Sequence, residues 1–436
     1  MKTSQPITGV RARPKTAAPS GGKALISDHR FGILAVTLVV SASLYNAMLA
    51  IISAHVKGLT SAAPIAMEGL LLGGAMGLAL LKRRPDGEDA PAIGLLYLFA
   101  LLAVFTSLAS DAVFPDAFRN VAIIAAFFLL GRRCSFPQVH LAFALLTIIT
   151  LTVLIFEIAF PTAYVSVFQP GNYYAATRGM EVSEFNETGL FNNAAGFESR
   201  FSFGVFSGAR TSSVFLEQVS NANFAGILCV FLVATWGRLS VAIRTTMVAT
   251  ILLILLSNNT RTSSALAVVT MMGYFIFPHL SRWFTLLIAP VLVLLAFLVV
   301  GDNVEHTDDL IGRLGITTEA LRKLDIPTIF GANAMKARHL MDTGFGYVTA
   351  SSSIFGLIAI WLFFSLGQRA TDTASKRCAW ATAVYLFANM MIGGTAIFSM
   401  KVAAPLWMLV GYMAATAPKP QTSRPNGLAP RGSIAA

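Results

Sequence analysis

Four cationic side chains stand where the chain enters or turns between long apolar runs. Arg210 precedes one run, Arg261 lies in the polar turn SNNTRTSS between two others, and Lys336 and Arg338 precede a fourth. Guanidinium groups bind phosphate oxygens through paired hydrogen bonds and keep their charge at any physiological pH. We therefore expect these cations to converge on an anion, and a lipid-linked pyrophosphate is the natural anion at that depth. The alternatives are a surface pair between Arg210 and Glu198 and an Arg261 that snorkels to headgroups.

Two groups nearby are candidates to accept a proton from a hydroxyl. Glu217 lies at the start of an apolar run, and helical spacing puts Asn221 and Phe224 on its side, which predicts a polar stripe facing a cavity. An interhelical hydrogen bond is the alternative for this stripe. His339 has a suitable unperturbed pKa, and the sequence does not choose between Glu217 and His339. Asp342 is expected to position His339 or Arg338, or to cap the next helix.

The elements that carry these residues are membrane helices. Of the 436 residues, 55% are hydrophobic and 12% are charged, and the mean hydropathy is +0.68, which excludes a soluble domain. The sequence predicts an all-α polytopic membrane protein with about twelve spans. Their expected bounds are 31–54, 60–81, 91–110, 117–131, 137–160, 214–236, 240–257, 263–279, 283–300, 346–367, 379–395 and 398–416.

The even number of spans puts both termini on one side, and the basic tails and alternate connections predict that this side is cytoplasmic. Residues 1–30 and 417–436 are expected to be disordered tails around a transmembrane domain at 31–416. Lys401, within the last predicted span, is expected to snorkel to the membrane surface.

Two long connections, 161–213 and 301–345, are expected on the other side of the membrane. The first is predicted to be a folded cap because it is rich in aromatic residues, which would contact sugar rings or anchor the cap to the membrane. They are Tyr164, Phe168, Tyr173, Tyr174, Phe185, Phe191, Phe197, Phe201, Phe203 and Phe206. The second contains TTEALRKL, in which Thr317 or Thr318 is expected to cap a short helix.

Several classes of protein are excluded by what the short connections lack. They contain no glycine-rich phosphate loop and no paired carboxylates for a metal-bound nucleotide. The cysteines, Cys134, Cys229 and Cys378, have no metal-ligand spacing. The basic pI of about 9.8 reflects membrane orientation, so nucleic acid is not an expected partner. No cofactor or metal is expected.

Three segments resemble the bacterial O-antigen polymerase and ligase superfamily, the Wzy-like enzymes, and particularly xanthan-type exopolysaccharide polymerases. RTSSVFLEQ resembles the arginine motif at the mouth of a span, with Gln218 in place of a proline. SNNTRTSSALA resembles the Ser-Arg-Thr/Ser turn. DTGFGYVTASSSIFGLI resembles an Asp-Asn-x-Tyr segment that leads to Gly356, and in it Thr343, Phe345 and Ser353 replace Asn, Tyr and Gly.

The resemblance implies a GT-C-type fold in the bacterial inner membrane. It implies metal-independent inverting transfer of a glycan from an undecaprenyl-pyrophosphate donor to a lipid-linked acceptor, on the periplasmic side. Membrane lipid, a chain-length regulator and export proteins would be partners. An O-antigen ligase shares this chemistry. A twelve-span transporter or glycan flippase is the rival from another class, although the sequence shows no related halves and its polar residues gather near one surface.

Overall fold

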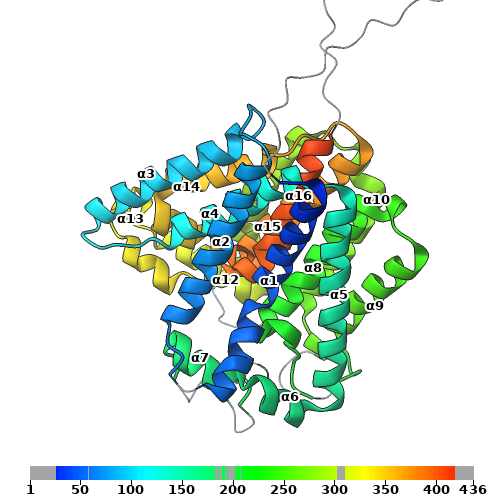
Figure 1. The fold of residues 1–436 in the computed structure, drawn as a ribbon. Coiled ribbons are helices and arrows are strands. Elements are labelled where there is room, and N and C mark those ends of the chain that lie inside the picture. Colours follow the sequence, from blue (N-terminus) through cyan, green and yellow to red (C-terminus); the bar gives the residue numbers. More distant parts are fainter. Residues whose placement is uncertain are drawn as a thin grey trace, which may run out of the picture.

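The computed structural model describes residues 26–56, 58–181, 185, 189–191, 194, 202–206, 208–301 and 310–417. Within these ranges the chain forms helices and connecting segments, with one isolated β-bridge between Phe185 and Phe191 (Figure 1). The expected all-α class is confirmed for this part of the chain.

Each of the twelve predicted spans overlaps one long helix. They are α1 (Asp28–His55), α2 (Ala62–Lys82), α3 (Ala90–Ala109), α4 (Asp116–Arg133), α5 (Phe136–Ala159), α8 (Gln218–Thr235), α9 (Val241–Asn258), α10 (Arg261–Ile276), α11 (Thr285–Val300), α14 (Gly344–Leu366), α15 (Thr373–Ile392) and α16 (Met400–Thr416). Eight helices in the described residues are long and apolar enough to cross a membrane, namely α1, α2, α3, α5, α8 with its 3₁₀ extension, α9, α11 with the turn before it, and α14. The protein therefore has the character of a multi-pass membrane protein.

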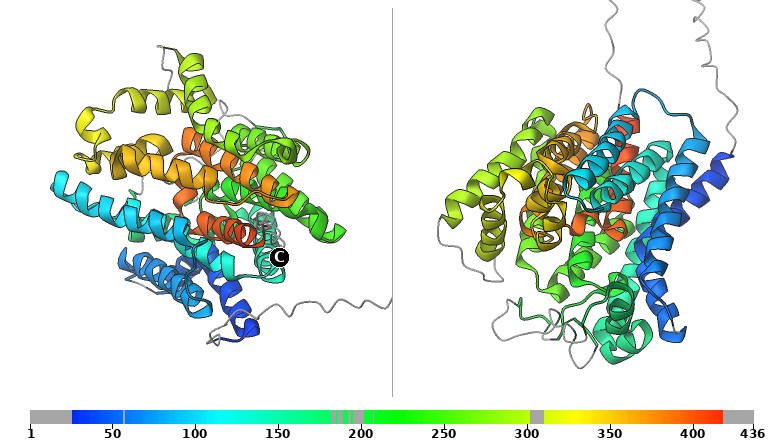
Figure 2. Two further views of the ribbon diagram at one scale, coloured as in Figure 1. Left: turned by 90° about the horizontal axis from the view of Figure 1, so that it is seen from above. Right: turned by 90° about the vertical axis from the view of Figure 1, so that its left-hand side faces the viewer.

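The remaining long helices, α4, α10, α15 and α16, fall outside that set. Of these, α4 and α16 form the centre of the bundle. All residues of α16 from Met400 to Ala414 are buried, and it packs along α4 (Figure 2). A Cβ added at Gly411 would lie 2.0 Å from the Phe128 carbonyl oxygen, and one at Gly131 would lie 2.1 Å from that of Met408. The two backbones therefore touch because glycine stands at both contacts.

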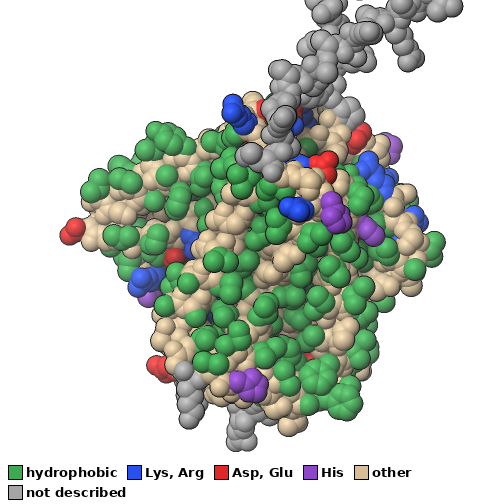
Figure 3. Space-filling view, viewed as in Figure 1, with side chains coloured by type: hydrophobic (Ala, Val, Ile, Leu, Met, Phe, Trp, Pro, Cys, Tyr) green, Lys and Arg blue, Asp and Glu red, His purple; other side chains and the backbone are tan. Residues whose placement is uncertain are grey.

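The long helices alternate in direction, which gives the bundle two distinct ends. Short connections at 83–89, 134–135, 236–240, 277–284 and 367–372 lie at the upper end in Figure 1, which we call the basic end. The first described helix begins there and α16 ends there. Figure 3 shows Lys and Arg side chains at this end, above a largely hydrophobic surface. The opposite end, which we call the loop end, carries the two long connections.

A charged cluster fastens the connections at the basic end. Asp89 is buried, and its carboxylate lies 2.7 Å from Arg132 Nε and 2.5 Å from Arg133. Burial acts to raise the pKa of Asp89, but the hydrogen bonds from Arg133 and the Asp86 backbone, with the charges of both arginines, bring it below its ordinary value. The start of α3 is thereby held to the end of α4.

The connection at 161–213 begins with two short helices, α6 (Pro161–Phe168) and α7 (Pro170–Arg178), whose aromatic side chains pack inward. Tyr164 Oη donates to the Ser213 carbonyl oxygen at 2.7 Å, and Tyr173 Oη donates to Asn46 Oδ1 at 2.6 Å. Buried aromatic residues thus attach this cap to α1 and to the segment before α8. Phe197 and Phe201 lie outside the described residues.

The second long connection contains α12 (Leu310–Arg322), α13 (Ile326–Ile329) and a 3₁₀ helix, η7 (Ala334–His339). The expected cap at Thr317 or Thr318 is wrong, because α12 already includes Leu310 and both threonines are buried inside it. Thr317 Oγ1 donates to the Met391 carbonyl oxygen at 2.7 Å, which ties α12 to the end of α15.

Candidate ligand-binding cavity

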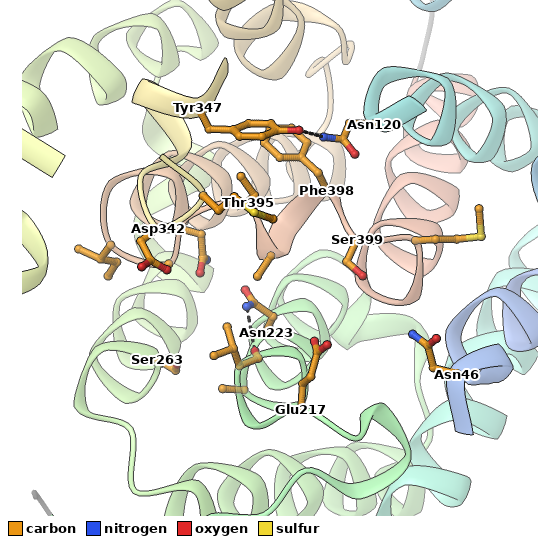
Figure 4. Close-up of a pocket in the computed structure, with 18 of the residues that line it drawn as sticks. Asn46, Asn120, Glu217, Asn223, Ser263, Asp342, Tyr347, Thr395, Phe398 and Ser399 are labelled. Atoms are coloured by element: carbon orange, nitrogen blue, oxygen red, sulfur yellow. Dashed lines mark hydrogen bonds between the residues drawn. The ribbon is translucent and has the colours of Figure 1, made fainter. Parts of the chain in front are cut away.

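A large cavity of about 1690 Å³ opens among the helix termini at the loop end. Its lining comes from α1, α2, α4, α8, α10, α12, α14, α15 and α16 and from the two long connections. In Figure 4, Asn46, Asn223, Glu217, Asp342 and Ser399 surround one hollow from different helices and from the turns that lead into helices. The volume exceeds that of a typical small-molecule pocket, so the cavity has room for a ligand larger than an ordinary small molecule.

The cavity is built to attract negative charge. Among the described residues, five arginines line it: Arg119, Arg178, Arg210, Arg261 and Arg313. Four carboxylates line it as well, Glu68, Asp116, Glu217 and Asp342, and Lys401 lies directly behind Glu217. These groups leave two positive charges in excess. The lining also includes N-cap or first-turn residues of α2, α4, α8, α10 and α16, and helix N-termini favour anions.

Arg210 is held at the cavity wall by the end of α9. Its Nε donates to the Asn258 carbonyl oxygen at 2.7 Å, and a terminal nitrogen donates to Asn258 Oδ1 at 3.0 Å. Asn258 Nδ2 in turn donates to the carbonyl oxygens of Thr211 at 2.8 Å and Gln218 at 2.9 Å. Asn258 therefore joins the turn after α9 to the segment that enters α8. Glu198, the alternative partner for Arg210, lies outside the described residues.

Arg261 is the first residue of α10, and its exposed side chain lines the same cavity. Asn259 adopts the left-handed conformation that ends α9, and the side chain of Thr260 accepts a hydrogen bond from the Ser263 backbone at 3.2 Å. This capped turn presents Arg261 at the start of a helix, where its charge and the helix dipole add to the same positive potential in the cavity.

Glu217 also lines the cavity, but it is engaged in two ion pairs. Its carboxylate lies 2.7 Å from Lys401 Nζ and 2.7 Å from Arg178 Nη1, and Ser220 Oγ donates to it at 2.9 Å. The expectation that Lys401 snorkels is wrong, because its side chain is fully buried and donates to the Phe215 carbonyl oxygen at 3.0 Å. A buried ammonium needs such partners, and Glu217 supplies the charge.

The turn before Glu217 has two non-glycine residues with positive φ, Ser213 at 48° and Leu216 at 59°. Glu157 holds this turn, because its carboxylate accepts the backbone N–H groups of Ser212 at 3.0 Å and Ser213 at 2.6 Å, and the Ser212 hydroxyl at 3.1 Å. Unfavourable backbone conformations persist where the surroundings over-determine them. Glu157 thereby fixes the direction in which Glu217 leaves the turn.

The predicted polar stripe on α8 is displaced by the geometry of its first residue. Glu217 is the N-cap, with an extended backbone at φ −135° and ψ 131°, so helical spacing begins only at Gln218. Asn223 lines the cavity instead, and Tyr385 Oη donates to its Oδ1 at 2.8 Å. Asn221 is fully buried away from the lining and donates to the Thr211 carbonyl oxygen at 3.3 Å. Asn221 therefore does not face the ligand space.

The expected convergence of four cations holds for Arg210 and Arg261 only. Lys336, Arg338 and His339 lie on η7 with exposed side chains outside the cavity lining, and Lys336 pairs with Asp325 at 2.7 Å. Asp342 lines the cavity, but Thr343 is the N-cap of α14, so the capping expectation for Asp342 is wrong.

Sequence reasoning missed three of the lining arginines. Arg119 pairs with Glu68, whose carboxylate accepts from Arg119 Nε at 2.7 Å and from Tyr45 Oη. Arg178 reaches the cavity from α7, and Arg313 reaches it from α12. Arg178 and Arg313 stand in connections where basic residues are common, so nothing in the sequence marks them. Only the fold shows that they reach the cavity.

No family model matches this chain, and comparison with curated proteins and with solved structures finds no similar protein. The functional argument therefore depends on the cavity.

Proposed function

We propose that this protein is a membrane glycosyltransferase of the GT-C type that polymerises lipid-linked glycan repeat units, with its loop end on the periplasmic side of a bacterial inner membrane. The observation that carries the proposal is the arginine-lined cavity at the loop end of a helical bundle. A donor with its lipid in the membrane would bring a pyrophosphate to that depth. The proposal includes that all twelve long helices cross the membrane.

In this proposal Arg210 and Arg261 bind the donor pyrophosphate. Both line the cavity, each is fixed by a capped or hydrogen-bonded turn, and both come from segments with family-like sequence. A guanidinium needs no proton exchange to stabilise the charge that grows on a leaving pyrophosphate. Preorganised donors of this kind each contribute roughly 2.7 to 4 kcal/mol to lowering a barrier.

The transfer forms a bond between an acceptor hydroxyl oxygen and the donor anomeric carbon on the face opposite the leaving group. The bond from that carbon to the pyrophosphate oxygen breaks, and pyrophosphate leaves with the electron pair. The hydroxyl proton goes to a carboxylate. Asp342 suits this step because, among the described residues, no hydrogen bond or ion pair occupies it, whereas Glu217 has three donors.

The test is reconstitution of the full chain in liposomes with a purified undecaprenyl-pyrophosphate oligosaccharide. We expect a ladder of products that differ by one repeat unit. Arg210→Ala and Arg261→Ala should each slow elongation by about 100- to 1000-fold. Lys323→Ala is the matched control, because this exposed lysine, directly after the last residue of α12, pairs only at the surface with Glu319.

Other outcomes would replace the proposal. Movement of the intact lipid-linked glycan across the bilayer without elongation would identify a flippase. Transfer that occurs only when a lipid A core acceptor is present would identify a ligase. Normal elongation by both arginine variants would remove the pyrophosphate role from these residues.

A further inference from the structure

A chain of three charged side chains runs from the centre of the bundle to the cavity: Lys401 on α16, Glu217 before α8, and Arg178 at the end of α7. We infer that Arg178 is a phosphate-binding residue of the cavity and that Glu217 and Lys401 are the positioning residues that hold it there. The identity of the ligand, a pyrophosphate on a lipid, rests on the proposed function.

The inner end of this chain is fixed. The Lys401 side chain is fully buried, and its Nζ lies 3.0 Å from the Phe215 carbonyl oxygen and 2.7 Å from Glu217 Oε2. Removing an ammonium from water is costly unless a paired charge and hydrogen bonds replace its hydration. Glu217 is therefore needed as a carboxylate to balance Lys401, before any ligand arrives.

The second oxygen of the same carboxylate faces the cavity wall. Glu217 Oε1 accepts from Arg178 Nη1 at 2.7 Å, and the Arg178 guanidinium carbon lies 4.6 Å from the centre of the buried Tyr174 ring. An ion pair on one edge and an aromatic face leave a guanidinium few orientations. Burial acts to lower the pKa of Arg178, but the charge of Glu217 outweighs it and raises that pKa above its ordinary value.

Arg178 keeps donors for a ligand. A guanidinium has five N–H groups, and within the described part of the chain Glu217 takes the one hydrogen bond of Arg178. Its side chain is 45% exposed and lines the cavity. The three charges sum to a single positive charge, and the accessible part of it is on Arg178.

This arrangement gives Glu217 a different role from the one its sequence position suggests. Lys401, Arg178 and Ser220 all donate to its carboxylate, so its oxygens are committed to the protein. A proton acceptor needs an open position toward the substrate hydroxyl. Glu217 therefore acts by setting the position of Arg178, without accepting the proton.

The test measures binding of geranylgeranyl pyrophosphate to the detergent-purified full chain by calorimetric titration, beside its thermal unfolding. Arg178→Ala should weaken binding by about 10- to 100-fold, the usual range for a lost charged hydrogen bond, with little change in the unfolding midpoint. Arg178→Lys should recover part of the affinity, since the charge remains. Lys323→Ala is the control for the loss of one surface cation.

A paired substitution separates positioning from stability. Glu217→Gln leaves Lys401 buried without a counter-charge and should lower the unfolding midpoint. Adding Lys401→Met removes that charge and should restore the midpoint, while ligand binding stays about tenfold weaker because Arg178 is no longer held. Wild-type affinity in the double variant, or in Arg178→Ala, would overturn the inference.

Binding and transfer can fail separately. If wild-type protein binds the prenyl pyrophosphate through Arg178 but elongates no glycan, the inference stands and the polymerase proposal falls. If the protein elongates glycan and Arg178→Ala binds the prenyl pyrophosphate as wild type does, the polymerase proposal stands and the inference falls.

Discussion

Glu157→Gln should disturb the site from a distance, because this carboxylate holds the turn that leads into Glu217. The substitution keeps the size of the side chain but replaces one acceptor oxygen with an NH₂ group. In the native structure the two oxygens accept from Ser212 N, Ser212 Oγ and Ser213 N. The remaining oxygen of Gln can keep the 2.6 Å bond to Ser213 N.

The new NH₂ group then faces the Ser212 N–H, and two donors cannot bond each other. The Ser212 N–H keeps only its second contact, of 3.1 Å, to the remaining oxygen, which it must share with Ser213 N. A buried donor left without a partner costs about 1 to 3 kcal/mol, and the shared oxygen recovers part of that cost. We therefore expect the free energy of unfolding to fall by about 1 kcal/mol. In a chain of this length that corresponds to a fall of about 1 to 2 °C in the unfolding midpoint, since the entropy of unfolding grows with size.

The effect on activity should be larger than the effect on stability. Ser213 and Leu216 hold positive φ only while the turn is fixed, so a relaxed turn moves Glu217 and Arg178 together. A misplacement near 1 Å can slow a reaction by about 100-fold. The assays are thermal unfolding in detergent and glycan elongation in liposomes. Thr147→Val is the control on the same helix, because its hydroxyl bonds only the Phe143 carbonyl oxygen of α5. A Glu157→Gln protein with the wild-type midpoint and rate would refute this reasoning.

Substitutions at three further positions, Asp89, Ser353 and Gly411, test the fold. Asp89→Asn should lower the free energy of unfolding by about 3 kcal/mol, because it leaves two arginines without their buried partner. Folding lowers the pKa of Asp89, so the stability that this carboxylate contributes is fully present above about pH 4 and is lost as the pH falls below that. Unfolding midpoints of wild type and Asp89→Asn measured against pH should therefore converge in acid. Ser353, inside α14, has φ 67° and ψ 174°. Ser353→Gly should therefore keep or raise the unfolding midpoint, and Ser353→Val should lower it. If the Val variant unfolds at the same temperature as the Gly variant, this backbone is unstrained. Gly411→Val should prevent α16 from packing on α4 and abolish recovery of folded protein in size-exclusion chromatography, whereas Gly77→Val, where a Cβ meets nothing within 4 Å, should be recovered normally.

The helices could be predicted from the sequence because membrane helices are local features. Each apolar run forms a helix at its predicted place, and α6 and α7 fold where aromatic residues are dense. Arg210 and Arg261 could be predicted at the cavity for the same reason, since each stands at the mouth of a helix. Roles and orientation in the membrane stay predictions.

The partners in the site could not be predicted, because they are far apart in the chain. Lys401 stands 184 positions from Glu217 and Arg178 stands 39 positions from it, and no periodicity connects them. The wrong placement of Asn221 at the cavity has a local cause. The helical spacing was counted from Glu217, which is the N-cap of α8 and is not itself helical. His339 shows that a suitable side chain type does not fix a position. It precedes α14, as the sequence suggests, but it lies on the exposed 3₁₀ helix η7, outside the cavity lining.

The position of Lys401 in the last of the described helices has a consequence for how the protein is made. Synthesis proceeds from the N-terminus, so α8 enters the membrane before α16 exists. Until then the Glu217 carboxylate has Arg178 as a charged partner but lacks the buried ammonium of Lys401. Packing of α16 against α4 and α8 completes the bundle and the cavity wall in one step, so a chain truncated before Met400 would lack both this wall and the cation behind Glu217.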